Sequence, residues 1–498
     1  MARKKSEFER AAGILLPVSS LPSNYGIGTM GRCAYEFVDF LKAAGQHYWQ
    51  VLPVGPTSYG DSPYQSFSAF AGNPYFIDLD TLCDEGLLKK SELDAVKWGE
   101  DPSCVDYAQL YAVRFDVLRK AFSRSRHQSE PAYIEFCKDN EDWLPDYCLF
   151  MSVKNSFGGV EWQKWDDDIR MRRPDTLAKY RRELADDIEF WSFIQYKFFC
   201  QWSALRDYAH EKGILIIGDI PIYISMDSAD AWANTDQFWM DEERRPVKVA
   251  GVPPDYFSKT GQLWGNPLYR WDVMEASDFA WWRRRISFAS RIYDVLRIDH
   301  FIGIVRYYAI DADADNAING EWLQGPSMKL LKAIDEARGA TKIIAEDLGE
   351  VVPEVRRVQI RSGYPGMKVL QFAFDSDASN VFLPHHHGEN FIVYTGTHDN
   401  DTTIGLVDNA RPAVRRFARE YLGVKRSAQL PEAIIRAAMA SVCHTAIIPM
   451  QDWLELGTEA RINRPAILGG NWEWRMGQGL LTDGLCDKIR KYTLTYGR

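Results

Sequence analysis

The sequence predicts an α/β protein built on a (β/α)8 barrel. Short apolar runs that end in polar residues, or in glycine and proline, recur along the whole chain. Amphipathic stretches with helical periodicity separate most of these runs, as strand-then-helix units require. The length of 498 residues also exceeds the size at which one compact core keeps growing, so we expect the barrel to carry insertions.

The apolar runs have the composition of buried parallel strands. In chain order they span Ile14 to Leu21, His47 to Val54, Ile214 to Ile224, Val295 to Phe301, Lys342 to Leu348, Met367 to Phe374, Phe391 to Thr397 and Ala446 to Gln451. Helical patterns between them are clearest at Ala34 to Ala44, Trp322 to Arg338 and Pro412 to Leu422. About eight strand-then-helix units are the number that a closed barrel of this kind needs.

Two breaks in this rhythm indicate insertions. After the second run, helical patterns at Tyr107 to Arg126 and Leu177 to Lys212 predict a large, mostly helical inserted subdomain. After the third run, a segment dense in glycine and proline predicts a long irregular loop over the barrel mouth. The expected division is 1–74 for the start of the barrel, 75–210 for the helical insertion, and 211–498 for the rest of the barrel with its loop at 225–267.

Composition narrows the class of partner. The net charge of -10 and the lack of a basic run disfavour nucleic acid and anionic membrane surfaces. The eight cysteines are scattered without zinc-like spacing, which is typical of reduced thiols in a cytoplasmic protein. No apolar stretch reaches the length of a signal-peptide core or a membrane span. The 17 tryptophans and 24 tyrosines exceed what a core needs, and rings are good platforms for the apolar faces of sugars.

Carboxylates close four of the predicted strands. Asp219 lies in the third run, Asp299 and Glu346 lie near the ends of the fourth and fifth, and Asp399 follows the seventh. Because the active site of such a barrel is built at the carboxyl ends of its strands, we expect these side chains to converge. One such carboxylate could simply cap the following helix. Several together are costly unless function needs them, since their repulsion raises one pKa and separates an acid from a nucleophile.

Converging carboxylates suit two chemistries. In glycoside chemistry, one carboxylate attacks the anomeric carbon while another protonates the leaving oxygen. Binding of calcium or magnesium is the rival use. Arg297 lies two residues before Asp299, on the same side of the strand, which disfavours a cation there and favours an ionised carboxylate.

Several blocks resemble the amylomaltases, the disproportionating 4-α-glucanotransferases of glycoside hydrolase family 77 in the α-amylase clan. Three resemble its catalytic blocks: Arg297 to His300, Ala345 to Gly349 and Gly396 to Asn400. Two more resemble this family and not ordinary amylases: Tyr59 to Gln65 with Gly72 to Tyr75, and Gly251 to Phe257 with Gly261 to Pro267. A C-terminal block, Asn463 to Arg475, differs at Ala466, where we expect glycine. The resemblance runs from about Gly13 to Arg475.

The resemblance implies a retaining enzyme that moves α-1,4-glucan segments to the 4-OH of an acceptor through a covalent glycosyl-aspartate. Asp299 is similar to the nucleophile, Glu346 to the acid/base, and Asp399 to the carboxylate that grips sugar hydroxyls in the transition state. The residues that resemble substrate-binding positions are Tyr64, Asp219, Asp255, Trp264, Arg297, His300 and His398. The implied partners are maltodextrin, starch or glycogen as donors, and glucose or maltooligosaccharides as acceptors.

Two other functions stay open beside this one. A hydrolase of the same clan would share the three carboxylates, although the blocks around Tyr64 and Trp264 favour the transferase. A non-catalytic glucan-binding protein should have lost at least one of them. We expect no metal and no cofactor, because three adjacent histidines from His385 to His387 cannot all face one ion, and Asp311 to Asp315 lacks the glycine and glutamate of a calcium loop.

Overall fold

The computed structural model describes residues 7–498, except Tyr59, 255–257, Glu350, Ala466 and Leu468. Within these residues, eight parallel strands form one sheet in the order β10-β11-β12-β1-β2-β3-β6-β9. The strands are β1 (Ala11–Leu15), β2 (Tyr48–Gln50), β3 (Leu215–Pro221), β6 (Val295–Asp299), β9 (Lys342–Ala345), β10 (Gly366–Val369), β11 (Phe391–Tyr394) and β12 (Thr445–Pro449). Each strand overlaps one of the eight predicted apolar runs.

The sheet closes on itself. The first strand, β1, pairs in parallel with β2 on one side and with the last strand, β12, on the other. The two ends of the sheet, β9 and β10, meet where the Ala345 amide donates to the Pro365 carbonyl at 2.9 Å. This arrangement confirms the predicted (β/α)8 barrel.

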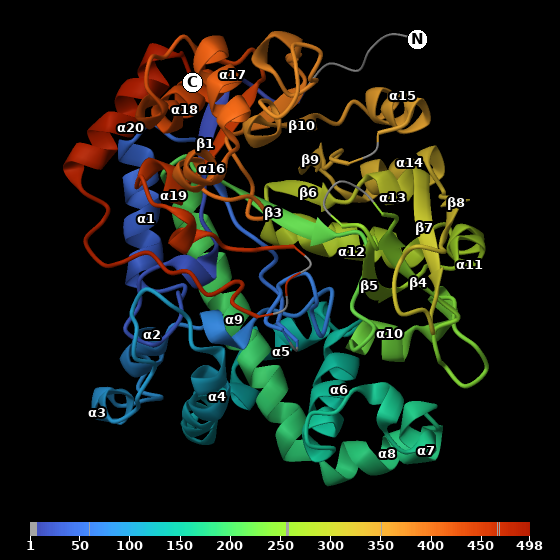
Figure 1. Cartoon of the computed structure of the whole chain (residues 1–498). Helices are drawn as coiled ribbons and strands as arrows, with labels where there is room; N and C mark the ends of the chain where they lie inside the picture. The colour runs from blue at the N-terminus through green and yellow to red at the C-terminus, as the bar shows by residue number, and fades with distance from the viewer. Residues whose placement is uncertain (1–6, 59, 255–257, 350, 466, 468) are drawn as a thin grey trace.

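The helices surround this barrel (Figure 1). Those outside the insertion are α1 (Arg32–Ala43), α10 (Ala229–Ala233), α11 (Trp271–Ala276), α12 (Ala280–Ile292), α13 (Ile302–Val305), α14 (Met328–Ala337), α15 (Pro353–Ser362), α16 (Thr403–Asn409), α17 (Pro412–Leu422), α18 (Leu430–Ala440), α19 (Met450–Trp453) and α20 (Asp483–Thr495). Among the described helices, none combines the length and the apolar composition that crossing a bilayer needs.

The insertion between β2 and β3 is helical, as predicted (Figure 1, the blue-green helices). It contains α2 (Leu79–Asp84), α3 (Lys90–Asp94), α4 (Tyr107–Arg124), α5 (Pro131–Asp139), α6 (Leu144–Ser156), α7 (Asp167–Arg170), α8 (Pro174–Glu183) and α9 (Ala185–Glu211). Two buried glutamines on α9 fasten it to the chain that leaves β2. Gln195 bonds the amide and carbonyl of Gly72, and Gln201 bonds those of Asp78, in both cases with both ends of its side-chain amide.

The segment inserted after β3 is present but is not an irregular loop throughout. It contains β4 (Lys248–Val252) and β5 (Gln262–Pro267), which pair antiparallel. Two strands from beyond β6, β7 (Arg306–Asp311) and β8 (Glu321–Gln324), extend this sheet to the order β5-β4-β7-β8. Glycine and proline are typical of loops, and they hid these strands for two reasons. The strands β4 and β5 are short, and the partner of β4, β7, is distant in sequence.

The inside of the barrel is a packed core. Each barrel strand contributes to one buried apolar cluster, which includes Leu15, Tyr48, Ile217, Val295, Ile344, Met367, Ile392 and Ile447. A larger cluster fills the space between the strands and the surrounding helices. Because apolar side chains pack against both faces of the strands, the barrel is a rigid support for the residues at their carboxyl ends.

A substitution at Gly218 on β3 tests how tightly the barrel strands are packed against the surrounding helices. A Cβ there would lie 2.3 Å from the buried Tyr293 ring, so Gly218→Ala should lower the free energy of unfolding by about 1 to 3 kcal/mol. Calorimetry at one scan rate should show a lower thermal midpoint. Gly484→Ala on α20 is the control, because nothing lies within 4 Å of a Cβ there, and it should leave the midpoint unchanged or higher. Equal midpoints for both variants would contradict the argument.

Candidate active site

The barrel brings the four predicted carboxylates to one rim. Asp219 lies within β3, and Asp299 is the last residue of β6. Glu346 follows β9 directly, and Asp399 comes shortly after the end of β11. Because all barrel strands are parallel, their carboxyl ends face the same side.

The buried Arg297 joins two of these carboxylates. Its Nη1 lies 2.5 Å from Asp219 Oδ2, and its Nη2 lies 3.0 Å from Asp299 Oδ1. The Tyr64 hydroxyl donates to the same Asp219 oxygen at 2.8 Å. Burial alone would lower the pKa of Arg297, but the two aspartates raise it well above its ordinary value. The guanidinium therefore stays charged and holds both aspartates in a fixed relative position.

Glu346 is 7% exposed and lies next to this group. Its two oxygens accept hydrogen bonds from the backbone amides of His300 and Leu348, each at 2.7 Å. The His300 backbone is left-handed, with a φ of 52°, which is uncommon for a residue other than glycine. Burial first, and repulsion from Asp299 second, raise the pKa of Glu346 to about 8. At neutral pH this carboxyl keeps its proton, as a general acid must.

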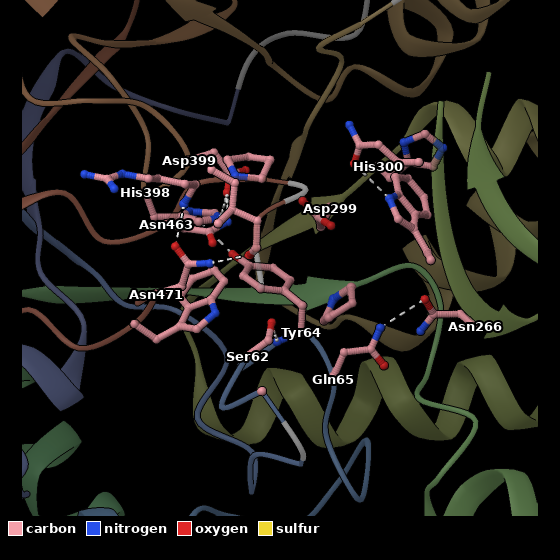
Figure 2. Close-up of a pocket in the computed structure, with 18 of the residues that line it drawn as sticks. Ser62, Tyr64, Gln65, Asn266, Asp299, His300, His398, Asp399, Asn463 and Asn471 are labelled. Carbon is pink, nitrogen blue, oxygen red and sulfur yellow. Dashed lines mark hydrogen bonds and ion pairs between the residues drawn. The ribbon is translucent and has the colours of Figure 1, made fainter. Parts of the chain in front are cut away.

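A cavity of about 370 Å³ opens beside these residues (Figure 2). Among the described residues, Asp299 and Asp399 line it, whereas Glu346, Arg297 and Asp219 are not among its lining residues. The wall also includes Tyr64, Gln65, Trp264, Asn266, His300, His398, Asn463, Asn471 and Trp472. Rings and amides of this kind suit an uncharged ligand with many hydroxyl groups, since amides both donate and accept hydrogen bonds.

Two aromatic contacts shape the cavity. Tyr64 stacks on His398, with ring centroids 5.1 Å apart and planes 19° apart, and Figure 2 shows it between His398 and Asp299. Trp264 on β5 meets the His300 ring edge to face at 4.9 Å. Burial lowers the pKa of His300 to about 4, so this imidazole is neutral at physiological pH.

Four amide side chains belong to the site although we assigned them no role from the sequence. Gln65 donates to Asn266 at 3.3 Å, which ties the segment after β2 to β5 (Figure 2). Asn463 donates to Asp399 Oδ1 at 2.6 Å, and Asn471 accepts from the Arg464 amide at 2.8 Å. Each of these amides lies in a block that resembles the amylomaltases, so the signal was the motif itself.

Two remaining predictions concern Asp255 and metal ions. Asp255, with its neighbours Tyr256 and Phe257, lies outside the described residues. In the part of the chain that the structure describes, no group of three or more histidine, cysteine, aspartate and glutamate side chains could hold a metal ion. The position between Asp219 and Asp299, where two carboxylates could bind a cation, is taken by Arg297.

Comparison with known proteins decides the family. A family model described as 4-α-glucanotransferase matches residues 16–481. The chain belongs to the 4-α-glucanotransferase family. This confirms the predicted family and enzyme class.

Relatives cover the chain almost end to end. The 4-α-glucanotransferase of Clostridium butyricum is 48% identical over 97% of this chain and 99% of its own length. That of Thermus thermophilus is 46% identical over 96% of both. Among solved structures, the amylomaltase from Streptococcus agalactiae in complex with acarbose superimposes with a TM-score of 0.95 at 41% identity, covering 98% of this chain and 100% of that one.

The raised pKa of Glu346 predicts how activity and stability depend on pH. If Glu346 is the general acid, kcat/KM should fall as pH rises through about 8. The folded state binds the Glu346 proton more tightly than the unfolded chain does, so this residue makes the free energy of unfolding decrease between about pH 4.5 and 8.

Thermal unfolding across that pH window checks the second point. Glu346→Gln should gain stability relative to the parent as pH rises from 5 to 8, because it removes the carboxylate that must otherwise ionise while buried. Glu420→Gln, at an exposed position on α17, is the control and should show no such trend. A parent and a Glu346→Gln variant with parallel curves would contradict a raised pKa.

Proposed function

We propose that this 4-α-glucanotransferase works by double displacement with retention of configuration. The observation that supports it is the contrast between two neighbouring carboxyls. Asp299 lines the cavity as the ion-pair partner of Arg297, while Glu346 is buried with a pKa of about 8. A charged nucleophile and a protonated acid are the two forms that the first step of a retaining mechanism requires.

In the first step, an Asp299 oxygen attacks the anomeric carbon of the donor. The bond from that carbon to the glycosidic oxygen breaks, and Glu346 gives its proton to the departing oxygen. In the second step, Glu346 takes the proton of the acceptor 4-hydroxyl, whose oxygen displaces Asp299 from the anomeric carbon. Both steps use the same two residues in reverse, so acceptor and leaving group occupy the same side of the site.

Asp399 and the aromatic residues hold the donor sugar in this proposal. Asp399 lines the cavity with a side chain that is 44% exposed, so it can accept hydrogen bonds from sugar hydroxyls. Its charge strengthens those bonds as positive charge develops on the ring. Because the Tyr64 hydroxyl is bound to Asp219 beside the nucleophile, we place the Tyr64 ring against the donor sugar.

The proposed substrates are α-1,4-linked glucans as donors, and glucose or maltooligosaccharides as acceptors. Incubation with maltotriose, followed by chromatography over time, tests this. Transfer gives a ladder of shorter and longer maltodextrins plus glucose, whereas a hydrolase gives only a monotonic fall in chain length. The second outcome would favour the hydrolase.

The roles of the two carboxyls can be separated with a donor that needs no protonation. With α-glucosyl fluoride, Glu346→Gln should still form a covalent adduct on Asp299, visible as a mass increase of the intact protein. Asp299→Asn should form none. An adduct on the Asp299→Asn variant would reverse the assignment. In a productive substrate complex, we expect the two carboxyls roughly 5 to 5.5 Å apart.

The preference for sugar over water is expected to depend on Trp264. The intermediate meets water at about 55 M, so transfer wins only if an acceptor is held and water is excluded. Trp264 lines the cavity beside His300, and the preceding residue on β5, Leu263, points to the other face of the sheet. Trp264→Ala should therefore raise hydrolysis relative to transfer, whereas the control Leu263→Ala should not.

Reducing ends measure this ratio, because transfer conserves their number and hydrolysis adds one for each bond cleaved. We compare the gain in reducing ends with the glucose released from maltotriose by the parent and both variants. Equal falls of both rates in Trp264→Ala, with an unchanged ratio, would mean that Trp264 only helps to bind the donor.

A further inference from the structure

The segment that follows β12 forms hydrogen bonds with the turn that carries Asp399. Asn463 Nδ2 donates to Asp399 Oδ1 at 2.6 Å, and the Asn463 amide donates to the His398 carbonyl at 3.1 Å. Arg461 Nη2 donates to the Asp399 carbonyl at 2.7 Å, and Arg461 Nε donates to the Asn463 carbonyl, also at 2.7 Å. One guanidinium thus joins the backbones of two segments that are distant in sequence.

These contacts leave the two oxygens of the Asp399 carboxylate in different surroundings. Oδ1 accepts from Asn463 and lies 3.4 Å from His398 Nε2. Within the described residues, no side chain or amide is bonded to Oδ2, on a side chain that borders the cavity (Figure 2). An anchored Oδ1 orients the carboxylate so that Oδ2 stays available to a ligand.

We propose that Arg461 and Asn463 are positioning residues that hold Asp399 ready to bind the hydroxyls of the donor sugar. This inference rests on the proposed role of Asp399. Asn463 fixes the carboxylate through its Oδ1 atom. Arg461 is not among the described residues that line the cavity, so it acts on the sugar only through the backbone of Asp399 and of Asn463.

The chemistry of arginine suits this role. Its planar fork donates from Nε and Nη2 in a fixed geometry, here to two carbonyls at equal distance. A lysine ammonium has no such fixed pair of donors. Without the fork, the Asp399 turn and the 461–463 segment can move apart, and a misplacement of about 1 Å can cost roughly 100-fold in rate.

We call the contacts of Arg461 and Asn463 with the Asp399 turn the clamp. Three variants test it with maltotriose as substrate. Arg461→Met and Asn463→Ala should each lower kcat roughly 10- to 100-fold, with smaller changes in KM. Arg461→Lys should recover part of the loss. Arg415→Met is the matched control, because Arg415 on α17 also donates to two backbone carbonyls, those of Val407 and Asp408, away from the site. Its kcat should equal that of the parent.

A double-mutant cycle shows whether these residues act through Asp399. In an Asp399→Asn background, Arg461→Met should cost less than threefold further, because the carboxylate that it positions is already absent. Thermal midpoints of all variants are measured alongside. If Arg461→Met costs the same factor with and without the Asp399 carboxylate, or if kcat follows the thermal midpoint alone, the clamp is wrong.

This design separates failure of the clamp from failure of the proposed function. If Asp399→Asn alone keeps the kcat of the parent, the role given to Asp399 is wrong, and the clamp is overturned with it. If Asp399→Asn is severely impaired while Arg461→Met and Asn463→Ala match the Arg415→Met control, the catalytic role of Asp399 stands and only the clamp is overturned.

Discussion

The site depends on one buried cation, Arg297, between Asp219 and Asp299. Burying Arg297 and Asp219 is costly, and buried ion pairs are a weak source of net stability. Their effect here is geometric. The guanidinium locks the end of β3 to the end of β6, and the Tyr64 hydroxyl adds a third segment through Asp219. Removal of the arginine would leave two carboxylates facing each other beside a third, Glu346, so the remaining residues could not keep their positions.

The two neighbouring carboxyls, Asp299 and Glu346, differ in their surroundings. Asp299 lies against the guanidinium, whereas Glu346 is separated from water and bonded to two backbone amides. Repulsion from Asp299 adds to burial and raises the pKa of Glu346. In the proposed mechanism, these surroundings distinguish the acid from the nucleophile.

The sequence predicted the barrel and the carboxylates because both depend on local patterns. Apolar runs located all eight strands, and the helix Pro412–Leu422 was predicted to the residue. Contacts between distant segments were not predictable in this way. The strands β4 and β7 pair although β6 lies between them in the sequence. In the local sequence around β4, glycine and proline therefore dominated the signal, which indicates a loop. The bond from Asn463 to Asp399 joins residues 64 positions apart, and no periodicity reports it.

The proposed catalytic residues and the residues that surround the cavity come from different parts of the fold. The residues proposed to make and break bonds lie at or beside the ends of barrel strands, which the packed interior holds in place. The amides and rings that surround the cavity come from the segment after β2, from β5, and from the segment after β12. In the proposed mechanism, the preference for sugar over water therefore depends on these three segments. These segments lie outside the barrel strands, where the fold leaves residue types least constrained.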